Sequence, residues 1–382
     1  MTIDIGGYKK IIVKVGSALL VANDEQNHQG GIRHAWLETL AADIADMKKK
    51  GHRVVVVSSG ASPLGRMLVR QSAKLESTAE SLEMKQAVSA IGQIPLMAAW
   101  RDAFAKHQLL VAQILLTQQD TEERHRHLNG RATIENLLSL GVIPIINEND
   151  SVATDELKYG DNDRLSARVG SMISADLLIL LSDVDGLYDK NPKINKNAKH
   201  IDKVDNITES IMNLARTSHD VRGTGGMITK LLAGKIANGA GMDMIITAGL
   251  LDYPLQKCLA NEVASTIFFS RVSAMTARKK WIAGLLSHEG EMVIDDGALK
   301  ALQAGKSLLS AGVQIIQTKS GFEKGAAILI KNLKNQRVGV GLINHDSVDA
   351  IKMVGKKSSE IKKNFDRLMK TELIDRDNLV LD

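Results

Sequence analysis

The sequence has few of the residues that mark several common classes of protein. Its single cysteine, Cys258, cannot form an internal disulfide, which excludes a disulfide-stapled secreted fold and suits a reducing cytoplasm. Aromatic residues make up only 3% of the 382 positions, too few to favour base stacking on single strands. No stretch approaches about 18 uninterrupted apolar residues, and the first residues lack the basic-then-apolar pattern of a secretory signal. We therefore expect a cytoplasmic protein without a transmembrane helix.

The positive charge is unevenly distributed along the chain. Residues 276–382 carry 18 lysines and arginines against 13 aspartates and glutamates, whereas residues 1–275 carry 31 of each kind. The excess indicates a separate module that could meet an anionic partner, although a solvated basic face explains it equally well. The predicted division is a first domain over 1–275, a linker over 276–288, a small domain over 289–370 and a tail over 371–382.

Strand and helix patterns alternate through the first domain. Six short apolar runs predict strands: Ile11–Val15, Val54–Ser58, Leu110–Leu116, Ile143–Ile146, Leu177–Leu181 and Met244–Ala248. Helical patterns lie between them: Ala35–Lys49, Leu82–Lys106, Arg131–Leu140, Arg164–Ser171 and Ile228–Asn238. Continuous β-branched runs are typical of parallel strands that are buried on both faces. The alternation predicts an α/β fold with a doubly wound, mostly parallel sheet sandwiched by helices, rather than a closed eightfold barrel.

Shorter segments separated by turn signals follow Arg271. The predicted strands are Glu291–Ile294, Val313–Thr318, Ala326–Ile330 and Val338–Leu342, with turns at Asp295-Asp296-Gly297 and Ser320-Gly321. These segments predict a small β-rich domain. We expect the residues before Lys9 to form a disordered leader, and the charged segment from Gly355 to Lys370 to include an exposed helix.

The most informative stretch is Gly223-Thr224-Gly225-Gly226-Met227-Ile228-Thr229-Lys230, which leads into a helical pattern. Glycines let several backbone N–H groups approach one ligand, and the following helix adds partial positive charge at its N-terminus. A lysine at that position suits a phosphate group. The spacing is not that of a Walker A loop, because three residues separate Gly226 from Lys230. Taken alone, the stretch could equally be a glycine-rich helix cap.

Two other strands end in small residues at the edge where an open parallel sheet binds its ligands. Lys14 is followed by Gly16-Ser17 and could reach over this turn to a phosphate, although an exposed lysine on an edge strand explains it as well. The string Ser58-Ser59-Gly60-Ala61 offers hydroxyl and backbone N–H groups that suit a carboxylate or phosphoryl group. A plain strand-to-helix turn is the alternative.

Acidic and amide side chains follow the next strands. Asn147-Glu148-Asn149-Asp150-Ser151 suits an ammonium group or a substrate with both donors and acceptors. Gly160-Asp161-Asn162-Asp163 precedes a helix, and capping explains only one of its three polar residues. Ser182-Asp183-Val184-Asp185-Gly186-Leu187-Tyr188 can hold an adenine or a ribose. The ten histidines show no metal-ligand spacing, and no nucleophile with an adjacent base is evident.

Taken in chain order, these strings resemble the amino acid kinase family, and among its members those that phosphorylate L-glutamate. They span nearly the whole first domain, and the last module resembles a PUA domain, a small β-rich fold best known from RNA-modifying proteins. The resemblance implies ATP-dependent phosphorylation of the γ-carboxylate of L-glutamate to L-glutamyl 5-phosphate, the first step of proline biosynthesis. A related kinase acting on another carboxylate, and an RNA-binding role carried by the C-terminal domain, are the alternatives.

The resemblance also implies a role for each matching position. The catalytic groups would be Lys14, Lys230 and Asp163, with the carboxylate orienting both lysines. The substrate-binding residues would be Ser59, Gly60, Asn147, Asp150 and Asn162. The ATP-binding residues would be Lys14, Gly16, Ser182, Asp183, Thr224, Gly225, Gly226, Met227, Ile228, Thr229 and Lys230. Ser182 and Ile228 depart from the family pattern, in which Thr and Ser are frequent at these positions.

Several ligands and partners follow from the same resemblance. ATP would be the co-substrate, and Mg²⁺ would be held mainly by nucleotide phosphates and water, so that few protein ligands need appear in the sequence. L-Glutamate would be the acceptor and proline the feedback inhibitor. We expect a homo-oligomer, either a dimer or a tetramer, with a weak RNA contact through the PUA-like domain and no membrane contact.

Overall fold

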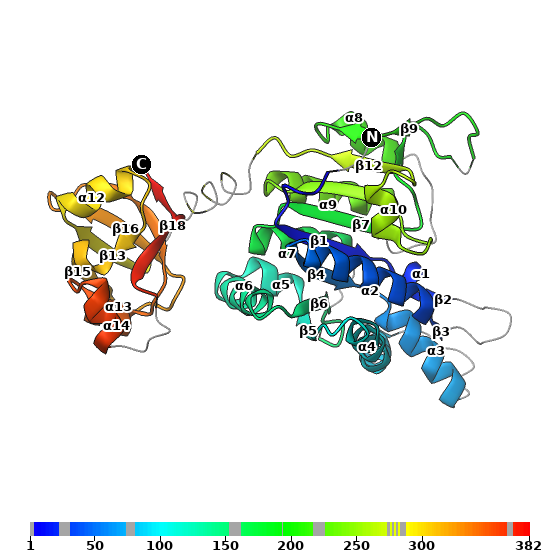
Figure 1. The fold of residues 1–382 in the computed structure, drawn as a ribbon, viewed down its shortest axis with the longest axis horizontal. Helices are drawn as coiled ribbons and strands as arrows, with labels where there is room; N and C mark the ends of the chain where they lie inside the picture. Colours follow the sequence, from blue (N-terminus) through cyan, green and yellow to red (C-terminus); the bar gives the residue numbers. More distant parts are fainter. Residues whose placement is uncertain are drawn as a thin grey trace. The chain divides into compact units, whose positions relative to one another are not determined.

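The computed structural model describes residues 4–22, 31–73, 81–152, 162–192, 194–216, 226–272, 276, 279, 282, 288–364 and 370–382. The chain forms two compact units, Met1–Ala274 and Met275–Asp382 (Figure 1). None of the helices in the described ranges is both long and apolar enough to cross a membrane.

An eight-stranded sheet forms the centre of the first unit. Its order is β10-β12-β11-β7-β1-β4-β6-β5. The strands are β1 (Lys10–Val15), β4 (Arg53–Ser58), β5 (Val111–Leu116), β6 (Ile143–Glu148), β7 (Leu177–Ser182), β10 (Lys203–Val204), β11 (Asp243–Ala248) and β12 (Ser265–Phe268). Every neighbouring pair runs parallel except β11 and β12. The predicted doubly wound, mostly parallel α/β fold is confirmed.

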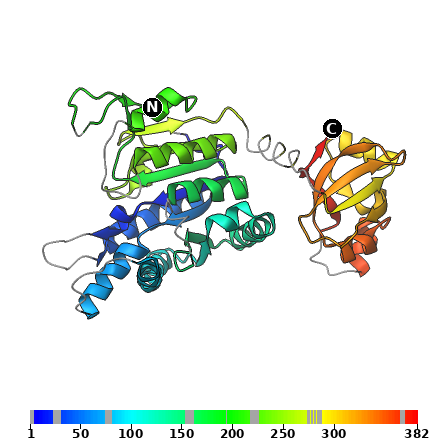
Figure 2. The same ribbon diagram turned by 180° about the vertical axis from the view of Figure 1, so that it is seen from behind.

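Helices cover both faces of this sheet (Figure 2). One face packs against α2 (His34–Lys49), α3 (Ala61–Ala73), α4 (Leu82–Ala105) and α10 (Pro254–Leu259). The other packs against α6 (Arg124–Ser139), α7 (Asn162–Ile173), α8 (Glu209–Arg216) and α9 (Met227–Gly239). The shorter elements of this unit are α1 (Ser17–Leu20), α5 (Gln118–Glu122), β2 (Val21–Ala22), β3 (Gly31–Ile32), β8 (Leu187–Tyr188) and β9 (His200–Ile201).

Side-chain alternation along the central strand β1 decides which face each residue serves. Ile11, Val13 and Val15 belong to the core on the α2–α4 side, whereas Ile12 belongs to the core on the α7–α9 side. Successive side chains on a strand point to opposite faces. Lys14 therefore shares the α7–α9 side with Ile12.

The second unit is built on a six-stranded sheet of order β14-β18-β17-β16-β13-β15. The strands are β13 (Gly290–Ile294), β14 (Leu308–Leu309), β15 (Val313–Gln317), β16 (Ala327–Asn332), β17 (Arg337–Ile343) and β18 (Glu372–Leu381). The helices that follow β13 are α12 (Asp296–Gln303), the 3₁₀ turn η2 (Ser310–Gly312), α13 (Ser347–Met353) and α14 (Ser358–Asn364). Apolar side chains of these strands and helices form a separate core, so this unit has the β-rich character predicted for it.

The structure differs from the sequence-based description at the ends of the segments. Residues 371–382 were predicted as a tail, but β18 pairs there with β17 and β14. Asp295 begins helix α12 rather than a turn, because its carboxylate accepts the N–H of Ala298 at 2.7 Å. Ile282, in the predicted linker, packs on the sheet of the second unit. The expected disordered leader is wrong for its described part, since Ile5 joins the first core and the Tyr8 hydroxyl donates to Asp243 at 2.7 Å.

Candidate active site

The carboxyl ends of β1, β4, β6, β7 and β11 lie at one edge of the first sheet, as their parallel pairing requires. Lys14 is the residue before the end of β1, in the middle of the sheet. The alternative of an exposed lysine on an edge strand is therefore wrong, because Lys14 is only 7% exposed. A buried ammonium group needs a charged partner to offset its desolvation.

Asp163 supplies that partner and binds a second lysine as well. Its Oδ1 lies 2.5 Å from Nζ of Lys14, and its Oδ2 lies 3.0 Å from Nζ of Lys230. All three side chains are buried, and the Asp163 side chain is fully so. Burial alone would raise the pKa of Asp163, but the two adjacent ammonium groups lower it well below its usual range. Three groups predicted as catalytic thus form one buried cluster with a net charge of +1.

The first turns of two helices position Asp163 and Lys230 in this cluster. Asp163 is the second residue of α7, and Lys230 lies in the first turn of α9, which begins at Met227 after the N-cap Gly226. The Thr229 hydroxyl donates to the Gly226 carbonyl at 2.6 Å and lies 3.3 Å from Asp163 Oδ2. A helix start carries free N–H groups and partial positive charge, so α9 presents an anion-binding end beside the two lysines.

Ile228, which departs from the pattern that the resemblance implies, contributes to the packing of the core. Together with Met227 it packs against the core on the α7–α9 side of the sheet. An apolar contact therefore stands where the resemblance implies a hydroxyl. Thr224 and Gly225, also predicted to bind ATP, lie outside the described residues.

The turn after β4 carries the first group of predicted substrate residues. The backbone N–H of Ser59 donates to the Val15 carbonyl at 3.1 Å, which ties this turn to the end of β1. Gly60 follows with φ of +107°, a conformation that side-chain-bearing residues rarely adopt. This turn between β4 and α3 therefore favours glycine at position 60.

Three predicted substrate residues meet through one amide. The Nδ2 group of Asn162 donates to Ser59 Oγ at 2.7 Å and to Asn147 Oδ1 at 3.1 Å. The Oδ1 atom of Asn162 is buried and has no hydrogen-bond partner among the described residues. A buried acceptor without a partner is costly, so it favours a ligand that brings a donor.

Asp150 contributes a carboxylate to the same side of the site. Burial raises its pKa above the ordinary value, while a hydrogen bond from the Ser89 side chain lowers it again. A desolvated carboxylate gains most from a cationic partner. Asp150 therefore suits the ammonium group of an amino acid.

The remaining predicted nucleotide residues lie on the other side of β1. Ser182 ends β7, and its hydroxyl donates to Asp183 Oδ1 at 3.0 Å. Gly16 follows β1 and is the N-cap of α1, and a Cβ built on it would lie 3.9 Å from Nζ of Lys14. The absence of a side chain at this position leaves the approach to the lysine open.

Sequence reasoning missed the residues that support this edge from the α4 side. The Trp100 indole N–H donates to Ser58 Oγ at 3.0 Å, and Ser89 on the same helix contacts Asp150. Ser58 ended a predicted strand and began a string expected to suit an anionic group, but no supporting role was given to it. The available signal was Trp100 itself, because a buried indole N–H needs an acceptor.

No group of three His, Cys, Asp or Glu side chains in the described ranges could hold a metal ion. The one carboxylate at the centre of the site, Asp163, already pairs with two lysines. The expectation that Mg²⁺ is held mainly by nucleotide phosphates and water stays a prediction.

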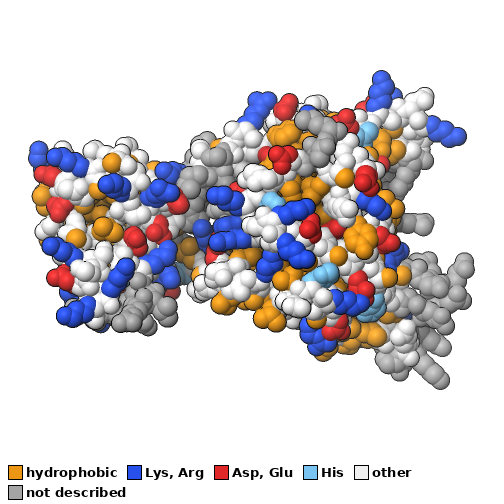
Figure 3. All heavy atoms as spheres, viewed as in Figure 1, with side chains coloured by type: hydrophobic (Ala, Val, Ile, Leu, Met, Phe, Trp, Pro, Cys, Tyr) orange, Lys and Arg blue, Asp and Glu red, His pale blue; other side chains and the backbone are white. Residues whose placement is uncertain are grey.

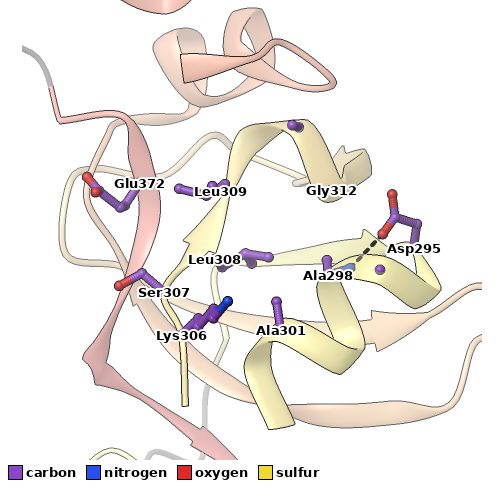
Figure 4. Close-up of a pocket in the computed structure, with 11 residues that line it drawn as sticks. Asp295, Ala298, Ala301, Lys306, Ser307, Leu308, Leu309, Gly312 and Glu372 are labelled. Carbon is purple, nitrogen blue, oxygen red and sulfur yellow. Dashed lines mark hydrogen bonds between the residues drawn. The ribbon is translucent and has the colours of Figure 1, made fainter. Parts of the chain in front are cut away.

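The second unit has a cavity of its own, of about 470 Å³, between α12, β14 and β18 (Figure 4). Small and apolar side chains line much of it, including Ala298, Ala301 and Leu308. Its charged lining consists of Asp295, Glu372 and Lys306, which gives a net charge of −1. This balance is unfavourable for phosphate groups, so the cavity does not favour an RNA backbone.

Known proteins resemble this chain over both units. The amino acid kinase family matches residues 9–248, and the PUA domain matches residues 290–365. The chain is 46% identical over 377 residues to the glutamate 5-kinase of Agrobacterium fabrum, covering 99% of this chain and 94% of that protein. It is 45% identical over 378 residues to the glutamate 5-kinase of Bradyrhizobium diazoefficiens, covering 99% and 98%. A solved carbamate kinase from Giardia lamblia, bound to AMP-PNP, is 16% identical with a TM-score of 0.49 and covers 70% of this chain and 100% of that one.

The relatives match over both units, and the buried cluster of two lysines and one aspartate lies within the matched kinase segment. The chain therefore belongs to the amino acid kinase family, in the branch of the glutamate 5-kinases that carry a PUA domain.

Proposed function

We propose that the protein transfers the γ-phosphoryl group of ATP to the γ-carboxylate of L-glutamate, giving L-glutamyl 5-phosphate for proline biosynthesis. The observation that carries this proposal is the buried Lys14–Asp163–Lys230 cluster beside the Ser59–Asn162–Asn147 group. The near full-length similarity to glutamate 5-kinases supports the choice of acceptor.

The chemistry needs positioning and positive charge rather than a general base. A free glutamate side chain has a pKa of about 4.3, so it is ionised near neutrality and can attack phosphorus directly. One carboxylate oxygen forms a bond to the γ-phosphorus while the bond to the ADP oxygen breaks. Negative charge accumulates on the transferring group and on the leaving oxygen. The enzyme must hold two anions together and neutralise this charge.

Lys14 and Lys230 would neutralise the transferring group from two sides. Asp163 would hold both ammonium groups in place, since each of its oxygens binds one of them. The N-terminus of α9 would add N–H donors to the same phosphate, with Met227, Ile228 and Thr229 in its first turn. The positive cluster is prearranged in the protein, which is the condition for strong electrostatic stabilisation of the transition state.

Acceptor and nucleotide would occupy opposite sides of the end of β1. Ser59, Gly60, Asn147, Asp150 and Asn162 would hold L-glutamate, with Asp150 facing the α-ammonium group. Gly16, Ser182, Asp183 and the first turn of α9, together with Thr224, Gly225 and Gly226, would line the nucleotide. The Oδ1 atom of Asn162, which has no partner among the residues that the structure describes, gives the acceptor site a place for an ammonium donor.

Mg²⁺ would enter with ATP and supply charge neutralisation of its phosphates. The described residues offer no cluster of protein ligands for it. We further propose that proline inhibits by occupying the glutamate site. The homo-oligomer is supported by apolar side chains exposed on α4, among them Ile94, which is 77% exposed. The cytoplasmic location remains a prediction, as do the limits of the domains apart from the tail over 371–382.

An RNA-binding role is less well supported. Lysine and arginine side chains on the visible face of the second unit are interspersed with aspartate and glutamate (Figure 3), and the lining of the cavity carries a net charge of −1. A nonspecific contact would require a continuous basic surface. Weak contact stays a prediction, and phosphorylation of glutamate is the function that the site supports.

The test is ATP turnover by the pure, full-length chain, with the product trapped by hydroxylamine as a hydroxamate. We expect turnover that depends on both L-glutamate and Mg²⁺, with L-aspartate as the matched acceptor control. Equal turnover with L-aspartate would favour the alternative of a related kinase for another carboxylate. Folded protein without any glutamate-dependent turnover would contradict the proposed function.

A further inference from the structure

We propose that Trp100 and Ser58 position the acceptor site from the α4 side of the sheet, so that Trp100 aligns the acceptor carboxylate without touching it. This inference rests on the proposed function, because it treats the Ser59 turn as part of the glutamate site. Trp100 and Ser58 are therefore positioning residues, and neither has been assigned a role in the reaction above.

A chain of two hydrogen bonds links α4 to the turn. The Trp100 indole N–H donates to Ser58 Oγ at 3.0 Å, and Ser58 Oγ donates to the Ser59 carbonyl at 3.1 Å. An indole N–H can only donate, and a serine hydroxyl has a single proton. Because Trp100 fills the accepting side of the hydroxyl, the Ser58 proton is directed to the Ser59 carbonyl. The chain therefore has one orientation, and both of its side chains are fully buried.

Ser59 is held from two further directions. Its N–H donates to Val15 on β1, and its hydroxyl accepts from Asn162 on α7. The α4 contact is the one that comes from the opposite face of the sheet, since Trp100 belongs to the core on the α2–α4 side. Removing it leaves the Ser59 carbonyl without this hydrogen bond, next to Gly60, whose φ of +107° sets the direction of the turn.

A second contact from α4 reaches the same site. Ser89 lies eleven residues before Trp100, and its side chain hydrogen-bonds to Asp150. Eleven residues correspond to about three helical turns, which places both side chains on one face of the helix. Ser89 and Trp100 are both buried. One helix thus contacts the two loops, after β4 and after β6, that are proposed to hold the two ends of glutamate.

The expected effect is specific to the acceptor. A misalignment of about 1 Å between reacting groups can lower a rate by roughly 100-fold. Trp100→Phe and Ser58→Ala should each lower kcat/KM for L-glutamate by about tenfold to 100-fold. The KM for ATP should stay within about twofold, because the predicted nucleotide residues other than Lys14 and Gly16 lie at the end of β7 and around the start of α9, away from this chain of hydrogen bonds.

The matched control is Trp36→Phe. Trp36 is buried in the same core, and its indole N–H also donates to backbone carbonyls, those of Gly249 at 2.8 Å and Leu251 at 3.2 Å. This substitution removes the same group from the same core, but at the loop after β11, which contains none of the proposed glutamate-binding residues. We expect a comparable decrease in Tm, with kcat/KM for L-glutamate within about twofold of wild type.

The experiment measures kcat and KM for both substrates, with Tm, in wild type, the three single variants and the Trp100→Phe/Ser58→Ala double variant. The inference predicts that the double variant is no worse than the worse single variant, because both changes break one chain. Three results would each overturn the inference and leave the proposed function intact. The first is a loss of kcat/KM for L-glutamate in the double variant equal to the product of the two single losses. The others are an unchanged kcat/KM in both Trp100→Phe and Ser58→Ala, and an equal loss in Trp36→Phe. Wild-type protein without glutamate-dependent turnover would overturn the proposed function, and this inference with it.

Discussion

The buried carboxylate of Asp163 is the most consequential single group in the site, and Asp163→Asn tests its role with almost no change in shape. The substitution leaves two ammonium groups, previously 2.5 and 3.0 Å from the carboxylate oxygens, without a counter-charge in a buried place. An asparagine oxygen can accept from one lysine, but the amide N–H₂ faces the other as a donor. The two lysines should then repel one another and move apart.

The magnitude follows from burial. Breaking a buried ion pair by removing one partner costs about 3–5 kcal/mol, a large part of the stability of about 5–15 kcal/mol that is typical of a domain. Because a domain of this size shifts by about 2–4 °C per kcal/mol, Tm should fall by roughly 6–20 °C. The misplaced lysines should also lower kcat by about 10²–10³-fold, as the loss of a transition-state donor does.

Denaturant unfolding and steady-state kinetics check both effects. The matched control is Asp46→Asn, whose carboxylate pairs with Lys50 at 2.7 Å but is 60% exposed; it should cost less than about 1 kcal/mol. Since the lysines lower the pKa of Asp163, its stabilising effect is present above the unfolded-state pKa of about 3.9 and is lost as pH falls through the folded-state value. The difference from wild type should therefore persist at pH 7. A loss below about 1 kcal/mol with normal kcat would refute this reasoning.

Three other substitutions extend the test. Lys230→Met should lower kcat by about 10²–10³-fold with little change in KM for glutamate, as steady-state kinetics would show. Lys235→Met, on the exposed face of the same helix, should leave kcat and KM unchanged. A normal kcat in Lys230→Met would remove that lysine from the mechanism. Burial raises the pKa of Asp43 to about 6, although two N–H donors of α10 lower it, so ionisation of this carboxyl opposes folding. The free energy of unfolding of wild type, relative to that of Asp43→Asn, should therefore fall by roughly 2–3 kcal/mol as the pH rises from 4 to 6. Unfolding curves whose difference does not change with pH would contradict this. A Cβ at Gly65 on α3 would lie 1.8 Å from a backbone carbonyl of α4, whereas a Cβ at Gly239 would meet open space. Gly65→Ala should therefore lower Tm strongly, and Gly239→Ala should not. Equal Tm values for the two variants would show that α3 and α4 can move apart.

The sequence predicted the parts of the fold that have a local cause. Continuous apolar runs such as Val54–Ser58 and Leu177–Leu181 became central parallel strands, because only a sheet covered on both faces can bury them. The strand β18 was missed because charged residues, Asp375-Arg376-Asp377, interrupt its apolar pattern in the middle. The antiparallel strand β12 is only four residues long, and its partner is set by tertiary packing rather than by its own residues.

The site could be predicted as a set of loops but not as a set of contacts. Their order along parallel strands placed Lys14, Asp163 and Lys230 at one edge of the sheet, although the sequence could not show that Lys14 lies on the central strand. The meeting of Asn162 with Ser59 depends on how α7 packs, which no spacing in the sequence gives. The support by Trp100 has the same origin, since it joins a helix to a strand 42 positions away.

The central claim is that an oxygen of the glutamate γ-carboxylate attacks the γ-phosphorus of ATP, and an isotope measurement tests it most directly. Glutamyl phosphate formed from L-glutamate labelled with ¹⁸O in the γ-carboxylate carries one labelled oxygen between carbon and phosphorus. When the α-amine displaces phosphate to close the five-membered lactam, the carbon–oxygen bond breaks and this oxygen leaves with the phosphate. Mass spectrometry of the released phosphate should find one ¹⁸O per molecule. Phosphate without the label, from protein that consumes ATP, would show that water is the acceptor and would contradict the account.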